Sequence, residues 1–233
     1  MTQRTSAKAP TIDGILLASC VDPDKEAPRV LDLGCGIGTA LLCFALHAPM
    51  ARITGIDKQE ELCRLARDNA MRNFANHDIT VFHCDILHMF DHIQPDSFDI
   101  VMTNPPYYSN HHTTRNIRAD KIAANVESLP LALWIKYAVR ALSAKGILVL
   151  IHRAERLHEI IQALDGLAGS IKIIPVWPKS ARAAKLFVIT ARRNARGASI
   201  LMPGITLHKD DGSYHDGAKD IFDHGKKMPF VRV

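Results

Sequence analysis

Val30-Leu-Asp-Leu-Gly-Cys-Gly-Ile-Gly38 begins as an apolar segment with strand character and ends in three closely spaced glycines. The residues that follow it, 39–47, have the apolar spacing of a helix. A glycine-rich turn between a strand and a helix allows a ligand to approach the backbone closely and directs helix N–H groups towards it. This stretch therefore predicts an α/β fold with a nucleotide-type site at the first strand.

The rest of the chain alternates between segments with strand and helix character. Further strands are expected at 52–56, 80–83, 98–103, 146–151, 171–176 and 186–190. Helices are expected at 11–21, 59–73, 130–141 and 153–164. Together with the first strand, this pattern predicts a seven-stranded, mostly parallel sheet with helices on both faces. A chain of 233 residues is long enough to form one domain with its own core.

A second diagnostic stretch is Phe-Asp-Ile-Val-Met-Thr-Asn-Pro-Pro-Tyr, residues 98–107. Two prolines cannot continue a β-ladder, so the strand must end at Thr103 or Asn104. The turn then presents two acceptors, the Asn104 side-chain oxygen and the Pro105 carbonyl, which can bind both N–H groups of an exocyclic amine. The ring of Tyr107 can stack on a planar substrate. The alternative is an ordinary surface turn without a ligand.

The spacing of the glycines limits the kind of nucleotide. A dinucleotide site prefers Gly-x-Gly-x-x-Gly, whereas the third glycine here comes one residue early. Asp57 ends the next strand at a spacing that suits a carboxylate binding two ribose hydroxyls, although it could also cap the following helix. Asp85 follows the third strand, where an aspartate is also common in turns.

Charge is distributed unevenly along the chain, whose formal net charge is +5. Residues 1–110 contain 9 Lys and Arg against 14 Asp and Glu, and residues 111–233 contain 20 against 10. An acidic first half suits a compact cationic cofactor, and a basic second half suits a polyanion such as RNA. The alternative is that these basic side chains are simply solvated on helix surfaces.

Several classes of protein are not indicated. No apolar run approaches the roughly 18 residues of a membrane span, and the polar start lacks a signal-peptide core, so a cytoplasmic location is expected. The five cysteines form no Cys-x-x-Cys pair and lie mostly in apolar segments, as expected of reduced core thiols. His111 and His112 have no partners at ligand spacing, so no metal is expected.

Three segments lack a clear pattern. Residues 1–10 are polar and small, and a flexible N-terminus is expected there. Residues 108–129 are too long for an ordinary connection and indicate a substrate loop. Its candidate phosphate contacts are Arg115, Arg118 and Lys121. Residues 191–233 form a basic and then turn-rich C-terminal segment.

Four motifs in order carry a resemblance to a known family. They are Ile12-Asp-Gly-Ile-Leu-Leu17, Asp32-Leu-Gly-Cys-Gly-Ile-Gly38, Asn104-Pro-Pro-Tyr107 and Leu207-His-Lys-Asp-Asp-Gly-Ser-Tyr214. This order resembles the small-domain type of class I S-adenosylmethionine-dependent methyltransferases, and within it the tRNA(Val) adenine-N6 methyltransferase family. The resemblance extends from about residue 11 to 222 and implies a single methyltransferase domain over 11–233, with an antiparallel last strand.

The resemblance also implies a reaction and a site. S-adenosylmethionine would donate its methyl group directly to an exocyclic amino nitrogen, foremost adenine N6 in tRNA. The implied catalytic residues are Asn104, Pro105, Pro106 and Tyr107. The implied cofactor-binding residues are Asp13, Asp32, Gly34, Cys35, Gly36, Gly38, Asp57, Lys58, Asp85, Ile86 and Asn104. Contacts to substrate RNA are expected at Arg115, Arg118, Lys121, Arg182 and Lys185.

Other functions fit the same motifs. The acceptor could be a protein glutamine, in a release factor or ribosomal protein, or guanine N2 in ribosomal RNA. A non-catalytic RNA-binding scaffold on the same fold is the alternative from another class. The basic second half favours RNA over a peptide, and a monomer is slightly favoured.

Overall fold

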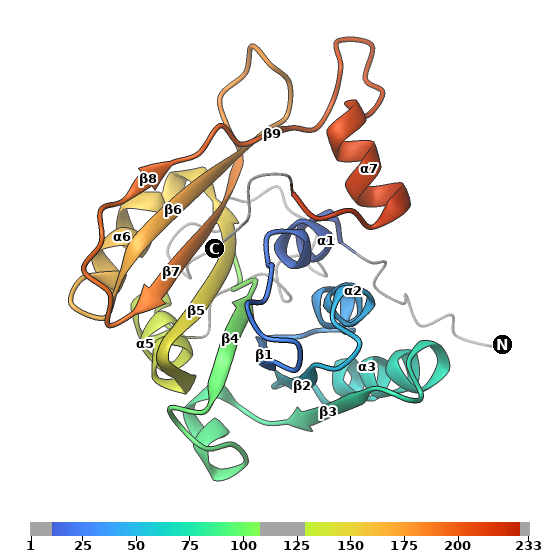
Figure 1. The fold of residues 1–233 in the computed structure, drawn as a ribbon, viewed down its shortest axis with the longest axis vertical. Helices are drawn as coiled ribbons and strands as arrows, with labels where there is room; N and C mark the ends of the chain where they lie inside the picture. Colours follow the sequence, from blue (N-terminus) through green and yellow to red (C-terminus); the bar gives the residue numbers. More distant parts are fainter. Residues whose placement is uncertain (1–10, 108–128, 229–233) are drawn as a thin grey trace, which may run out of the picture.

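The computed structural model describes residues 11–107 and 129–228. Its centre is a nine-stranded sheet with the order β3-β2-β1-β4-β5-β7-β6-β8, and β9 also pairs with β6 (Figure 1). The strands are β1 (Arg29–Leu33), β2 (Arg52–Asp57), β3 (Asp78–His83), β4 (Phe98–Thr103), β5 (Leu142–Arg153), β6 (Ala168–Trp177), β7 (Leu186–Arg193), β8 (Ile200–Leu201) and β9 (Ile205–Thr206).

The first five strands are parallel, and β7 is antiparallel to both of its neighbours, β5 and β6. This confirms a mostly parallel sheet in which the seventh strand is antiparallel. The expected count of seven strands is wrong, because β8 and β9 add two strands parallel to β6. Each has only two residues, too few for alternation of apolar and polar residues to be recognised in the sequence.

Helices cover both faces of the sheet (Figure 1). They are α1 (Ile12–Ser19), α2 (Thr39–His47), α3 (Glu60–Asn73), α5 (Leu131–Ala141), α6 (Leu157–Leu164) and α7 (Asp216–His224), with short 3-10 helices η1 (Ile86–Asp91) and η2 (Ala154–Arg156). The helix expected from residue 153 therefore begins as β5 and η2. Helix α7, with nine residues in the C-terminal segment, was not expected from the sequence.

Two hydrophobic cores lie on opposite faces of the sheet. Alternate residues of β4 divide between them: Ile100 and Met102 pack with α1, α2 and α3, whereas Val101 packs with α5 and α6. This follows from the two-residue period of a strand, which points successive side chains to opposite faces. The strands are thus fixed from both sides, and their carboxyl ends form a rigid edge.

Candidate functional site

A cavity of about 530 Å³ opens at the carboxyl ends of β1, β2 and β4. The strand order reverses here, since β1 pairs with β2 on one side and β4 on the other, and ligands of open α/β sheets bind at such points. Thirteen expected site residues line it: Asp13, Asp32, Gly34, Cys35, Gly36, Asp57, Lys58, Asp85, Ile86, Asn104, Pro105, Pro106 and Tyr107. Gly38 does not line it and instead caps the start of α2.

The glycine-rich loop after β1 has a conformation that most side chains disfavour. Gly34 and Gly36 have φ values of 78° and 56°, in the left-handed region. A side chain at Gly34 would also come within 3.0 Å of the Trp134 ring from α5. The N–H groups of Gly34 and Cys35 donate to the Ile56 carbonyl of β2, at 2.8 and 3.0 Å. The loop is therefore held against the sheet with its outer surface towards the cavity.

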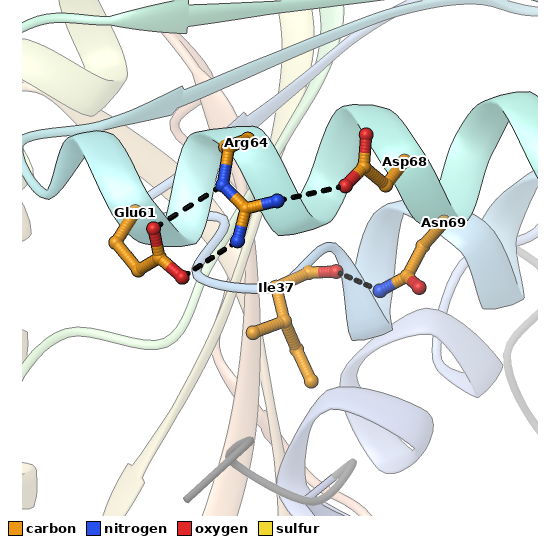
Figure 2. A network of polar contacts seen from close by, with 5 residues as sticks. All are labelled: Ile37, Glu61, Arg64, Asp68 and Asn69. Carbon is orange, nitrogen blue, oxygen red and sulfur yellow. Dashed lines mark hydrogen bonds and ion pairs between the residues drawn. The ribbon is translucent and has the colours of Figure 1, made fainter. Parts of the chain in front are cut away.

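Helix α3 holds the tip of this loop from the other side (Figure 2). The side-chain amide of Asn69 donates to the Ile37 carbonyl at 3.1 Å. On the exposed part of the helix, Arg64 pairs with Glu61 at 2.7 Å and with Asp68 at 3.1 Å. Such exposed pairs contribute little to stability, so the contact that bears on the cavity is the one made by Asn69.

Asp57 is positioned to accept hydrogen bonds from a ligand. Its Oδ2 accepts from the Gly36 N–H and its Oδ1 from the Gln59 N–H, both at 2.9 Å. Gln59 is the N-cap of α3, so Asp57 does not cap that helix. Each carboxylate oxygen has two lone pairs, and one backbone bond leaves each able to accept another hydrogen bond.

A second carboxylate, Asp32 at the end of β1, is more deeply buried. Its side chain is 2% exposed, and its Oδ2 accepts from the Leu41 N–H of α2 at 3.1 Å. Burial raises the pKa of Asp32 to about 7, the Leu41 bond opposes the shift, and the negative charge of Asp57 adds to it. Asp32 therefore changes its charge near neutral pH.

Asp85 and Ile86 lie at the start of η1 and face the same cavity. Asp85 is the N-cap of this short helix, and its Oδ1 accepts from the Leu87 N–H at 2.9 Å. The structural role that an aspartate after a strand often has is therefore present. Because Asp85 also lines the cavity, that role does not exclude a contact with a ligand.

The turn after β4 provides the other wall of the cavity. The side-chain Oδ1 of Asn104 is buried and has no hydrogen-bond partner among the described residues. Buried acceptors are nearly always paired, because an unpaired one loses its hydration without compensation. Pro105 and Pro106 have no N–H group that could satisfy it. The free oxygen therefore marks a place where a donor from a ligand can bind.

Tyr107, the last residue of the turn, is bonded to the first helix. Its hydroxyl donates to Oδ2 of Asp13 at 2.5 Å. Burial raises the pKa of Asp13, and the bond from Tyr107 partly opposes that shift. Burial and the neighbouring Asp13 raise the pKa of Tyr107, so the phenol stays protonated. This bond links α1 to the turn across the cavity.

A buried hydroxyl fixes the end of β4 relative to the glycine-rich loop. Thr103 donates to the Leu33 carbonyl at 2.7 Å and accepts from the Trp134 indole at 2.9 Å. All of Thr103 is buried, so these bonds are shielded from water. Together they join β4, β1 and α5 directly below the cavity.

Some residues at the site were not predicted from the sequence. The cavity is also lined by Thr11, Gly14, Ile37, Thr39, Ala40, Ile56, Gln59, Leu62, Leu129 and Trp134. Trp134 lies within the helix expected at 130–141, and nothing in the local sequence indicates that its indole N–H has a partner 31 residues away. Asn69 could have been recognised from the sequence as a residue with a specific partner, because its polar amide lies on the apolar face of α3.

The residues expected to contact RNA fall into two groups. Arg115, Arg118 and Lys121 lie outside the described residues, as do His111 and His112. Arg182 and Lys185 are exposed in the connection between β6 and β7 and do not line the cavity. Because β6 is parallel to the first five strands, this connection leaves the sheet at the same edge as the cavity.

Within residues 11–107 and 129–228, no three His, Cys, Asp or Glu side chains are grouped as they would be to hold a metal ion. Across the same residues, no helix has both the length and the apolar character needed to cross a membrane.

Comparison with known proteins identifies relatives. A curated tRNA1(Val) (adenine(37)-N6)-methyltransferase of Glaesserella parasuis is 32% identical over 134 residues, covering 58% of this chain and 54% of the relative. One of the same name from Porphyromonas gingivalis is 33% identical over 154 residues, covering 64% and 60%. The chain thus spans between half and two thirds of these curated relatives.

A solved structure confirms the fold. The crystal structure of a predicted O-methyltransferase of Agrobacterium tumefaciens has a TM-score of 0.75 at 23% identity, covering 92% of this chain and 97% of that one. The family model for the methyltransferase small domain matches residues 9–174, which include the glycine-rich loop and the Asn104 turn. The chain therefore belongs to the methyltransferase small domain family.

Proposed function

We propose that this chain transfers the methyl group of S-adenosylmethionine to an exocyclic amino nitrogen, that of adenine N6 in tRNA. The observation that carries the proposal is the buried Oδ1 of Asn104, which has no hydrogen-bond partner among residues 11–107 and 129–228, in a cavity whose opposite wall is a glycine-rich loop. Membership of the methyltransferase small domain family and the names of the two curated relatives support the same reaction.

The residues of the cavity fit the cofactor. Asp57 has acceptor capacity left for the ribose hydroxyls, and the loop from Gly34 to Gly38 gives room for the cofactor to lie against backbone. Asp85 would accept from the adenine amino group, beside the apolar Ile86. Asp13 and Asp32 lie in the cavity wall, where a cationic sulfonium would favour their ionised forms. When bound, the cofactor supplies an electrophilic methyl group.

The turn after β4 would hold the acceptor. Asn104 Oδ1 and the Pro105 carbonyl would accept the two N–H hydrogens of the amine, which draws the nitrogen lone pair out of conjugation with the ring. Tyr107 would stack on the base. Positioning then accounts for most of the rate enhancement, because the nitrogen becomes acidic as it is alkylated and can release a proton without a strong base.

A structured RNA would deliver the base. An adenine paired or stacked in a loop must be turned outwards to reach a cavity at the sheet edge. Arg182 and Lys185 lie in the connection that leaves the sheet at that edge. They would contact phosphates, together with Arg115, Arg118 and Lys121. A tRNA substrate would place the enzyme in the cytoplasm. We further propose that residues 11–233 form a single domain and that the protein is a monomer.

The direct test uses the purified protein and methyl-labelled S-adenosylmethionine. Total tRNA, ribosomal RNA and release-factor protein are incubated separately, and the products are analysed as nucleosides and peptides by mass spectrometry. Label in N6-methyladenosine from tRNA is expected. Label in a glutamine side chain, or only in ribosomal RNA, would instead assign the alternative acceptor.

A single substitution tests the role of the turn. Asn104→Ala should reduce turnover by about 100-fold, because it removes one of the two acceptors that hold the amine. Its affinity for S-adenosylhomocysteine, measured by calorimetry, should stay within about threefold of the original. Asn76→Ala, at an exposed amide far from the cavity, is the matched control. Equal turnover of Asn104→Ala and the unmodified protein would refute the amine-holding role.

A further inference from the structure

His152 is a buried titratable residue that has no part in the reaction described so far. It lies near the end of β5, opposite Phe187 in the antiparallel ladder with β7, and none of its side chain is exposed. It does not line the cavity. A polar ring at this position needs an explanation, because its neighbours in the strand, such as Ile151, are apolar core residues.

The ring of His152 packs against the turn that would hold the substrate. Its centroid lies 5.2 Å from that of Tyr107, with an interplanar angle of 72°, which is the edge arrangement that aromatic pairs favour. The other end of Tyr107 is bonded to Asp13. The phenol is therefore fixed at its hydroxyl by α1 and along its ring by β5.

The hydrogen bonds of the imidazole define its state. The Arg153 N–H donates to Nδ1 at 2.9 Å, so in the neutral ring the hydrogen is on Nε2. Burial lowers the pKa of His152 to about 4, and the charge of Arg156 acts in the same direction. The backbone at Pro106 and Arg153 and the charge of Glu159 partly oppose that shift. The ring is therefore neutral at neutral pH.

The imidazole also lies near Pro106 of the same turn. Nε2 is buried and makes no hydrogen bond of good geometry within residues 11–107 and 129–228. The Pro106 carbonyl is nevertheless close enough to raise the pKa of the imidazole. The ring therefore lies beside both Pro106 and Tyr107.

We propose that His152 is a positioning residue that fixes the ring of Tyr107, so that an incoming base meets an aromatic surface already at the required angle. This inference rests on the proposed methyl transfer and adds to it a residue 45 positions away from Tyr107 in the sequence. His152 touches neither cofactor nor substrate and acts only through Tyr107 and Pro106.

The test compares His152→Leu, which keeps apolar volume without a ring, with His152→Phe, which keeps a ring. His152→Leu should bind S-adenosylhomocysteine normally by calorimetry but lose roughly tenfold in turnover on tRNA, as expected of a displaced positioning group. His152→Phe should recover most of that loss. In the Tyr107→Ala background, His152→Leu should cause a clearly smaller loss, because only the contact with Pro106 remains. A role in core packing alone predicts equal effects of Leu and Phe, and an undiminished loss in that background.

A second measurement does not depend on methyl transfer. The protein labelled with 3-fluorotyrosine gives a fluorine resonance for residue 107, assigned with Tyr107→Phe. That resonance should shift or broaden in His152→Leu and return towards its original position in His152→Phe. An unchanged resonance in His152→Leu would overturn the proposal. If the unmodified protein methylates no tRNA, the proposed function fails, and this resonance alone decides the role of His152. If His152→Leu does not fold, His152→Gln serves for both measurements.

Discussion

At the scale of single residues, the polar groups of the cavity differ in whether their side-chain oxygens already accept hydrogen bonds from the protein. Asp57 is already bonded to two backbone N–H groups and is fixed in place before any ligand arrives. Asn104 has a buried oxygen that none of the described residues pairs with, which is unfavourable unless a donor binds it. A rigid carboxylate suits a cofactor that binds in one pose, and an unpaired acceptor suits a group that must be gripped only during the reaction.

Asp57→Ala should weaken cofactor binding. The change removes the acceptors proposed for the ribose and also frees the Gly36 N–H that shapes the loop. Losing hydrogen bonds to a charged group corresponds to roughly a 10- to 100-fold lower affinity for S-adenosylhomocysteine by calorimetry. Asp68→Ala, on α3, removes a carboxylate whose side chain is 47% exposed, and this control should bind normally. Unchanged affinity in Asp57→Ala would count against the ribose assignment.

Asp32 makes stability depend on pH. Its pKa is about 7 in the folded protein against 3.8 for a free side chain, so the folded state binds more protons between these values. Its contribution to the free energy of unfolding is therefore full at low pH and declines as pH rises to about 7, by a few kcal/mol at most. Asp32→Asn removes this titration and keeps an acceptor for Leu41.

Urea denaturation at two pH values tests this effect. The stability of Asp32→Asn minus that of the original protein should be larger at pH 8 than at pH 5. The reason is that only the original protein must bury an ionised carboxylate at the higher pH. The same difference between the two proteins at both pH values would show that Asp32 does not titrate in this range.

At the scale of elements, the glycine-rich loop and the turn after β4 are held by residues from three different helices. Asn69 of α3 bonds the glycine-rich loop, Trp134 of α5 bonds the end of β4 through Thr103, and Asp13 of α1 bonds the turn at Tyr107. Sites supported in this way keep their geometry without a ligand.

The contact made by Asn69 can be separated from the ion pairs on the same helix. Asn69→Ala should lower the free energy of unfolding by about 1 kcal/mol and weaken binding of S-adenosylhomocysteine several-fold, because the Ile37 carbonyl loses its donor. Arg64→Ala removes only exposed pairs and should leave binding unchanged. If both variants bind the cofactor product equally well, the amide does not support the loop.

Much of this arrangement could be predicted from the sequence, for reasons visible in particular elements. Strands β1 and β4 can be recognised in the sequence as apolar runs that stop at glycines or prolines. Thirteen of the expected site residues line one cavity. The bond from Tyr107 to Asp13 spans 94 residues and leaves no local pattern. The strands β8 and β9 are too short to show a period.

At the scale of the whole molecule, the C-terminal segment returns to the helix that begins the cavity (Figure 1). Ala218 and Ile221 of α7 belong to the same core as α1, and the Met228 N–H donates to the Ser19 carbonyl at 2.9 Å. Lys227 pairs with Asp22 at 2.5 Å. The chain's last described residues thus brace α1, whose first turn carries Asp13.

Weakening the packing of α7 on α1 should therefore reduce turnover at the site. Ile221→Ala deletes a side chain that is 2% exposed, and such changes destabilise by about 2 to 4 kcal/mol. Because α1 loses part of its packing, the bond from Tyr107 to Asp13 should loosen, and turnover should fall below the level explained by the unfolded fraction alone. Asp223→Ala, on the exposed side of α7, should change neither stability nor turnover. Thermal unfolding and turnover measured well below the melting temperature test both effects. Full turnover by the folded fraction of Ile221→Ala would mean that α7 stabilises the fold without supporting the site.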